Sequence, residues 1–294
     1  MIVYLIPLFL LSLLSSLENK PKYQIILKNK NFFFIIFFLF MFFIGLRNQI
    51  GCDWKGYIYH FKFNSSLSWG ELIFSRGQNI LDIGYTVISK LISYKFGFSV
   101  LIFTISSLFT VPLFLFCYQI KRTYLSLLIS YPYFIVVVGM GPIRQSAAIG
   151  FMILSIIFLS QYKNNLLFIS SIISSLFHVS GMIFISFAFL NIKKSTNEIF
   201  YLITRLIFIV AILLLIIYNF EWAFVKLSFY LKYYPVSSKA NSAIVIWLIN
   251  FFPMALYITN ISKFNFSKIF NKVCIFFFSF EIITLFGLFV NNVI

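Results

Sequence analysis

Nine long apolar stretches dominate the sequence and restrict the folds that the chain can adopt. A helix needs about 20 apolar residues to cross a hydrocarbon layer of roughly 30 Å, and shorter runs suffice where the bilayer thins. Of the 294 residues, 61% are hydrophobic and 10% are charged, which is more apolar surface than a soluble core buries. The sequence therefore predicts an all-α polytopic membrane protein. The stretches are 2–17, 32–46, 98–119, 124–140, 146–160, 166–190, 199–219, 242–260 and 272–290.

The basic residues lie mainly in the short links between these stretches. Four lysines occupy the link 18–31, and Lys121 and Arg122 follow the third stretch. Because short cytoplasmic loops are enriched in Lys and Arg, both links are predicted to be cytoplasmic, which leaves the N-terminus, the segment 47–97 and the turn 141–145 outside. We interpret the net charge of +16 as basic residues that orient the chain in the membrane and attract anionic lipid headgroups. We therefore expect no nucleic-acid binding.

The stretch 166–190 is long and contains His178 near its middle. As a single span it would leave Lys193 and Lys194 outside, together with the lysines of the link 261–272. Splitting it at His178 places all of them inside, so we predict two short half-helices that meet near His178 at the outer side. The expected architecture is one integral membrane domain, 1–294, with about nine to ten transmembrane or half-membrane helices.

The segment 47–97 is the one large aqueous loop and is predicted to be extracytoplasmic. Aromatic residues recur at helical spacing around Tyr57 and Phe61, and a second pattern comprises Ile83, Val87, Ile88, Leu91 and Ile92. Both patterns are typical of amphipathic helices lying in the membrane plane. Three of the seven carboxylates in the chain belong to this loop: Asp53, Glu71 and Asp82.

Asp53 follows a span directly, with Gly51 beside it to allow a tight turn. A carboxylate at this place is suited to act as general base toward a sugar hydroxyl. An N-cap role at the start of a helix explains the same residue equally well.

Arg144 lies in the short outer turn that Gly141 and Pro142 create between two spans. An arginine at a helix N-terminus is a natural phosphate clamp, because guanidinium donors and backbone N–H groups converge there. The alternative is an interfacial arginine whose charge extends toward water.

Three further ionisable residues interrupt apolar stretches. His178 is a functional candidate because an intramembrane ionisable side chain is costly. The alternative is a structural histidine that bonds a neighbouring helix carbonyl. Arg205 and Glu281 are predicted to lie at comparable depth and to form a structural ion pair. With two histidines and no metal-ligand spacing, we expect neither a metal site nor a cofactor.

Four short motifs, in order, resemble the EpsG family of membrane proteins, which is related to Wzy-type O-antigen and capsule polymerases. They are Arg47-x-x-x-Gly51-x-Asp53 with Tyr57, Asp82-Ile83-Gly84-Tyr85, Ile143-Arg144-Gln145 with Ala147 and Ala148, and Phe177-His178-Val179-Ser180. The resemblance covers roughly residues 30–190.

The resemblance implies polymerisation of undecaprenyl-diphosphate-linked repeat units at the outer face of the bacterial cytoplasmic (inner) membrane. In that reading Arg47 and Arg144, with the adjacent Gln145, bind the diphosphate leaving group. Asp53 accepts the proton of the acceptor hydroxyl and His178 assists as acid, base or phosphate donor. The sugar is oriented by Asp82 and Tyr85, with Tyr57 beside them. A chain-length regulator and a flippase are candidate partners.

Two other functions fit the same residues. A membrane glycosyltransferase that uses a polyprenyl-phosphate sugar would add one branch rather than a ladder of repeats. A flippase of lipid-linked glycans would use Arg205 and Glu281 to line a path, but such transporters favour repeated halves, and the sequence shows none. No nucleotide-binding loop or Asp-x-Asp motif is present, so we expect the substrate to arrive through the membrane.

Overall fold

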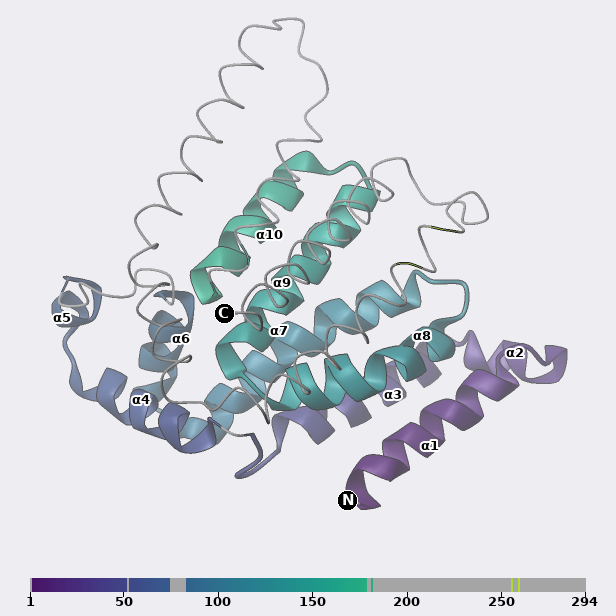
Figure 1. The fold of residues 1–294 in the computed structure, drawn as a ribbon, viewed down its shortest axis with the longest axis horizontal. Helices are drawn as coiled ribbons and strands as arrows, with labels where there is room; N and C mark the ends of the chain where they lie inside the picture. Colours follow the sequence, from purple (N-terminus) through teal and green to yellow (C-terminus); the bar gives the residue numbers. More distant parts are fainter. Residues whose placement is uncertain are drawn as a thin grey trace, which may run out of the picture. The chain divides into compact units, whose positions relative to one another are not determined.

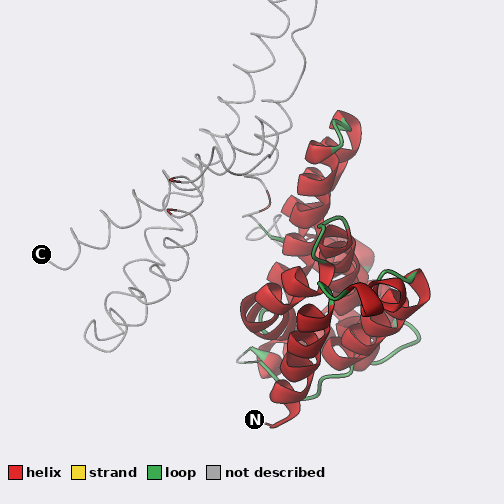
Figure 2. Ribbon diagram, turned by 90° about the vertical axis from the view of Figure 1, so that its right-hand side faces the viewer, coloured by secondary structure: helices red, strands yellow, loops and turns green. Residues whose placement is uncertain are grey.

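The computed structural model is helical throughout the part that it describes, residues 2–51, 53–74, 83–178 and 181 with the isolated residues 255 and 259 (Figures 1 and 2). The chain divides into two compact units, 1–188 and 189–294, and every helix with described bounds belongs to the first. These helices are α1 (Ile2–Leu17), α2 (Pro21–Leu27), α3 (Lys30–Gly45), α4 (Trp54–Ser66), α5 (Trp69–Phe74), α6 (Ile83–Ser93), α7 (Phe98–Tyr118), α8 (Thr123–Ser130), the π-helix η2 (Tyr131–Val138), α9 (Ile143–Ser160) and α10 (Asn164–Phe177).

The predicted all-α membrane fold is confirmed. Among the described helices, α7 with 21 residues and α9 with 18 residues are long and apolar enough to cross a membrane. A third span results if α2 and α3, which are bent by 67° at their junction, count as one. The predicted stretches at 2–17, 124–140 and the start of 166–190 form shorter apolar helices. The three stretches after residue 198 lie outside the described residues.

Helix α3 shows how these helices divide their surface between protein and lipid. One face is buried against the bundle and the opposite face is exposed although it is equally apolar. An exposed helix face made of large apolar side chains is a surface for lipid rather than for water. The buried face comprises Phe33, Ile36, Phe40 and Ile44, and the exposed face comprises Phe34, Ile35, Phe38, Leu39 and Phe42.

Helix α9 packs between α7 and α10. A Cβ atom on Gly150 would overlap the backbone of Leu108 and Phe109, so glycine is what allows α9 to approach α7 so closely. Toward α10, Ser155 Oγ lies 2.8 Å from Ser170 Oγ. Small residues and interhelical hydroxyl contacts hold membrane helices together where the hydrophobic effect does not distinguish lipid from protein.

The two links predicted to be cytoplasmic meet at one end of this unit. The carboxylate of Glu18 accepts hydrogen bonds from the backbone N–H groups of Tyr124 and Leu125, at 3.2 and 3.3 Å. These groups belong to the first turn of α8, where a negative charge complements the helix dipole. Arg122 Nε donates to Asn19 Oδ1 at 3.1 Å beside them. The contacts explain why the basic links lie together.

The stretch 124–140 is not one regular α-helix, because α8 changes into the π-helix η2 at Tyr131. Pro132 lies at the start of η2, and a proline removes a backbone donor and crowds the preceding turn. At the other end, the Gly139 N–H donates to the Phe134 carbonyl five residues earlier. The wider turn displaces the carbonyls at the end of η2 from regular α-helical positions.

Candidate functional site

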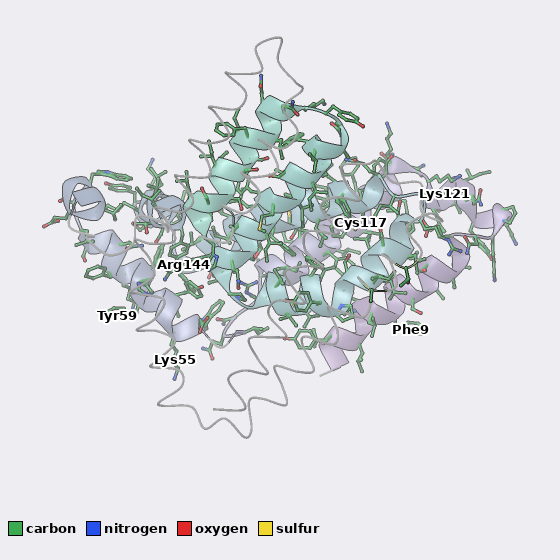
Figure 3. All side chains as sticks on the ribbon, turned by 45° about the horizontal axis from the view of Figure 1, so that its top comes forward. Phe9, Lys55, Tyr59, Cys117, Lys121 and Arg144 are labelled. Carbon is green, nitrogen blue, oxygen red and sulfur yellow. The ribbon has the colours of Figure 1, made fainter. Side chains whose placement is uncertain are left out.

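The described residues of the four motifs converge at the end of the bundle opposite the basic links. The C-terminus of α3 and the N-termini of α4, α6 and α9 supply the first three motifs, and the C-terminus of α10 supplies the fourth. Figure 3 shows Arg144, Lys55 and Tyr59 toward one end and Lys121 toward the other. Their shared apolar cluster contains Trp54, Tyr57, Tyr85, Leu101, Ile102, Ile105, Ile143, Ala147, Ala148 and Phe177.

The loop 47–53 is seated on the turn that precedes α9. Gln49 has φ of +54° and Gly51 has φ of +111°, so the loop uses two left-handed residues within three positions. A Cβ atom on Gly51 would lie 3.0 Å from the carbonyl oxygen of Met140. Backbone in these regions persists only where surrounding contacts hold it, and it is common at functional sites. The sequence expectation of a tight turn at Gly51 is therefore met, with a contact to the turn 139–141 in addition.

Arg47 is a buried cation in this loop, with 7% of its surface exposed. Its Nη1 donates to the Gly139 carbonyl, the group at the end of η2. Its Nε makes no hydrogen bond to any described residue. Burial lowers the pKa of Arg47 to about 10, against the raising effects of Tyr57 and Tyr4. The guanidinium remains charged at neutral pH, and a buried charge requires an anion or an acceptor near it.

Arg144 is the second residue of α9 and lies half-buried between two tyrosines. Its guanidinium carbon is 5.5 Å from the centroid of the Tyr57 ring and 5.3 Å from that of Tyr85. The two rings are 5.8 Å apart in an edge-to-face arrangement. Gln145 follows in the same first turn and is also half-buried.

The N-terminus of α9 has the character of an anion site. Its N-cap residue is Pro142, whose side chain makes no capping hydrogen bond. The first N–H groups of any helix have no acceptor within the helix, and the helix dipole adds partial positive charge there. Arg144 adds a full positive charge at the same place.

Asp53 occupies the N-cap position of α4, and its side chain is exposed. The position is the one that the N-cap interpretation predicts, but the carboxylate makes no capping hydrogen bond. The first turn of α4 is closed instead by backbone contacts, including Tyr57 N–H to the Asp53 carbonyl at 3.0 Å. The Asp53 carboxylate is thus accessible and is not committed to holding the helix.

Helix α10 ends at Phe177, and His178 adopts an extended conformation with φ of −160° and ψ of 139°. The Gly181 N–H donates to the His178 carbonyl at 2.9 Å, and a Cβ on Gly181 would overlap the backbone of Ser174 and Ser175. The chain therefore turns back at His178, as the predicted meeting of two half-helices requires. The second half-helix lies outside the described residues.

The second and fourth motifs contact each other through Gly84. A Cβ on Gly84 would lie 3.1 Å from the carbonyl oxygen of Leu176 and 3.3 Å from the ring of Phe177. This approach brings the start of α6 against the end of α10, next to His178. Tyr85, His178 and Arg144 are consequently held by elements that pack on one another.

Comparison with known proteins identifies the family. The EpsG family model matches residues 30–294. This chain belongs to the EpsG family. Its members are Wzy-like membrane proteins of the polysaccharide polymerase and glycosyltransferase type. The match extends beyond the 30–190 range in which the motifs are visible. No curated protein matches the chain, and no solved structure does.

Some predicted site residues of this EpsG-family protein fall outside the described part of the chain. They are Asp82, Arg205 and Glu281, so the predicted ion pair stays a prediction. Within the described residues, no group of three or more His, Cys, Asp or Glu side chains is placed to hold a metal ion.

Sequence patterns also gave no indication of Lys90, which is 6% exposed on α6. Its Nζ donates to the carbonyls of Ser65 and Leu67, at 2.9 and 2.5 Å, at the end of α4. The apolar pattern of α6 is instead half-buried or exposed, and Leu91 is 55% exposed. The helix thus buries polar residues against α4 and leaves an apolar side outward, as a helix at a lipid interface does.

Proposed function

We propose that this EpsG-family protein polymerises undecaprenyl-diphosphate-linked oligosaccharide repeat units of an O-antigen, capsule or exopolysaccharide. The reaction breaks the bond between the anomeric carbon of the growing glycan and its diphosphate oxygen. A new bond joins that carbon to a hydroxyl oxygen of the next lipid-linked unit, and the hydroxyl proton passes to a base. The protein acts as a multi-pass enzyme of the bacterial cytoplasmic membrane, with its site at the outer face.

The observation that carries this proposal is a pair of arginines beside the start of α9. Arg47 donates to the Gly139 carbonyl before the helix, and Arg144 is the second residue of the helix, although their motifs are almost a hundred residues apart. Arg47 is buried, charged and has an Nε atom without a hydrogen-bond partner among the described residues. Negative charge grows on a diphosphate as it leaves, and prearranged cations stabilise that charge more strongly than they stabilise the ground state.

The neighbouring residues support an acid–base role beside this anion site. Asp53 is exposed and free of capping bonds, as a general base must be to reach a sugar hydroxyl. His178 lies at the turn after α10, where it assists as acid, base or phosphate donor. Gln145 donates to the diphosphate from the first turn of α9, and Asp82 orients the sugar. No metal ion or cofactor enters the proposed reaction.

This placement also defines the partners that the enzyme needs. A lipid-linked substrate made inside the cell requires a flippase to reach an outer site. The length of the product requires control, which a chain-length regulator supplies. Both partners are part of the proposal.

A gene deletion complemented with matched variants tests the proposal. Surface polysaccharide is run on a gel, and we expect the deletion to lose the ladder of repeats and to keep a single capped repeat. Arg144→Gln should fail to restore the ladder, whereas Arg122→Gln, an arginine at the opposite end of the bundle, should restore it. Both variants are compared at equal protein level in the membrane.

Two other outcomes contradict the polymerase. A ladder that persists with each rung shifted by one sugar per repeat unit indicates a branching transferase that uses a polyprenyl-phosphate sugar. Complete loss of surface glycan, with no capped repeat, indicates a flippase or an earlier transferase. Restoration of the full ladder by Asp53→Asn would show that Asp53 is not the general base. It would not bear on the arginine site, which Arg144→Gln tests.

A further inference from the structure

We propose that Tyr57 and Tyr85 form a cation–π clamp that holds the Arg144 guanidinium in place for the lipid diphosphate. The inference rests on the proposed function and deepens it, because it assigns the two tyrosines to positioning of Arg144 rather than to contact with sugar. The three groups come from different helices, α4, α6 and α9.

Burial and distance together support the clamp. Tyr57 is 8% exposed and Tyr85 is 2% exposed, so neither ring offers an open face to a sugar. The guanidinium carbon of Arg144 lies 5.5 and 5.3 Å from the two ring centroids, within the range of about 6 Å in which the ring quadrupole attracts a cation. The two rings contact each other edge to face, which fixes their relative orientation.

A clamp of ring faces suits an arginine that must receive an anion. A carboxylate would hold the guanidinium equally well but would neutralise its charge. A ring face attracts the cation through its quadrupole and leaves the net charge intact. The two rings therefore restrain the orientation of the Arg144 guanidinium at the N-terminus of α9 without themselves cancelling its charge.

The clamp also connects the outer loop to the anion site. Helix α4 packs against α6, and α6 packs against α7 and α10. Lys90 of α6 donates to the carbonyls at the end of α4, and Asn64 of α4 donates to Ser89 of α6 at 3.3 Å. These contacts fix the spacing of the two tyrosines. The loop helices thus position a residue that belongs to neither of them.

The test is binding of undecaprenyl diphosphate to the purified full-length protein in nanodiscs. Tyr57→Leu and Tyr85→Leu should each raise the Kd by about 3- to 10-fold. The Kd of Tyr57→Phe and of Tyr85→Phe should stay within about twofold of the wild-type value. In an Arg144→Gln background, where binding is already weaker, the leucine substitutions should have no further effect. This non-additivity would show that the rings act through Arg144, which separates a clamp from a general structural role.

Two tyrosine controls and one substitution series exclude a simple packing defect. Tyr59→Leu, on the exposed side of α4 with 68% exposure, and Tyr124→Leu, buried at the opposite end, should bind with the wild-type Kd. If a leucine variant of Tyr85 does not fold, phenylalanines carrying increasing numbers of ring fluorines replace it. Fluorination keeps the ring shape and weakens the negative face, so the Kd should rise step by step.

The possible failures are distinguishable. Equal binding by wild type and Arg144→Gln would overturn the proposed diphosphate site and the clamp with it. Weakened binding by Arg144→Gln, together with unaffected leucine variants or a flat fluorination series, would overturn the clamp alone. Leucine effects that persist in the Arg144→Gln background would also overturn it, because the rings would then act independently of the arginine.

Discussion

Replacement of Gly51 by alanine tests whether the loop 47–53 must be seated on the turn before α9. The residue has φ of +111°, and an added methyl group would lie 3.0 Å from the Met140 carbonyl oxygen. Backbone strain of this kind costs about 1–3 kcal/mol. A methyl group forced into a packed contact costs a further ~1–3 kcal/mol. Because loop movement relieves part of both, we expect a loss of about 2–4 kcal/mol in the stability of the seated loop.

The assay combines thermal unfolding of the purified protein with the polysaccharide ladder in complemented cells. Gly51→Ala should unfold at lower temperature and shorten or abolish the ladder, because Arg47 and Asp53 flank the displaced residue. Gly56→Ala is the matched control, since no atom lies within 4 Å of a Cβ built there and the position is inside α4. Alanine favours a helix over glycine by up to ~1 kcal/mol, so this control should be neutral or stabilising. An unfolding midpoint for Gly51→Ala equal to that of Gly56→Ala, with a full ladder, would refute the reasoning.

Three further predictions concern the elements around the site. Lys90→Met should destabilise the packing of α4 on α6 by about 2 kcal/mol, because the carbonyls at the end of α4 lose a charged donor; an unchanged unfolding midpoint would contradict this. Gly150→Ala should cost about 1–3 kcal/mol by separating α9 from α7, as measured by thermal unfolding; wild-type stability would show that the helices do not approach so closely. Glu71 accepts a hydrogen bond from the Ser68 N–H, and Ser68 Oγ accepts one from the Glu71 N–H. The Ser68 backbone hydrogen bond is the main cause that lowers the pKa of Glu71 from 4.5, so this cap should be intact at neutral pH and be lost as the pH falls through the lowered pKa. Hydrogen exchange in α5 should then differ between Glu71→Gln and wild type at pH 7 and converge at acid pH, whereas a constant difference would exclude titration of Glu71.

Hydropathy and the helix-breaking residues locate the long helices of the bundle, but they do not predict α2, which lies in the link 18–31, or the division of 124–140 into α8 and η2. The predicted span 98–119 is α7, Phe98–Tyr118, and the predicted span 146–160 is α9, which begins three residues earlier at Ile143 because Pro142 starts it. The predicted break at His178 coincides with the end of α10. These features are local, so the order of apolar, polar and helix-breaking residues contains the information that determines them.

The features that sequence reasoning missed depend on contacts between distant segments. The donation from Arg47 to the Gly139 carbonyl joins residues 92 positions apart, and no pattern within either segment indicates it. Burial of Lys90 depends on the carbonyls of α4 that face it. Side-chain chemistry and motif order predict the residues of the site. They do not predict that Tyr57 and Tyr85 contact Arg144, because that contact depends on the packing of three helices.

Reconstitution of the purified protein with lipid-linked repeat units tests the central claim most directly. The full-length chain in liposomes is supplied with undecaprenyl-diphosphate-linked repeat units from its own host, without any sugar nucleotide. We expect a ladder of products and release of undecaprenyl diphosphate in proportion to the bonds formed, with both lost in Arg144→Gln and retained in Arg122→Gln. A folded protein that leaves the repeat units unjoined would exclude the polymerase, and an Arg144→Gln variant that joins them as well as the wild type would exclude the arginine site.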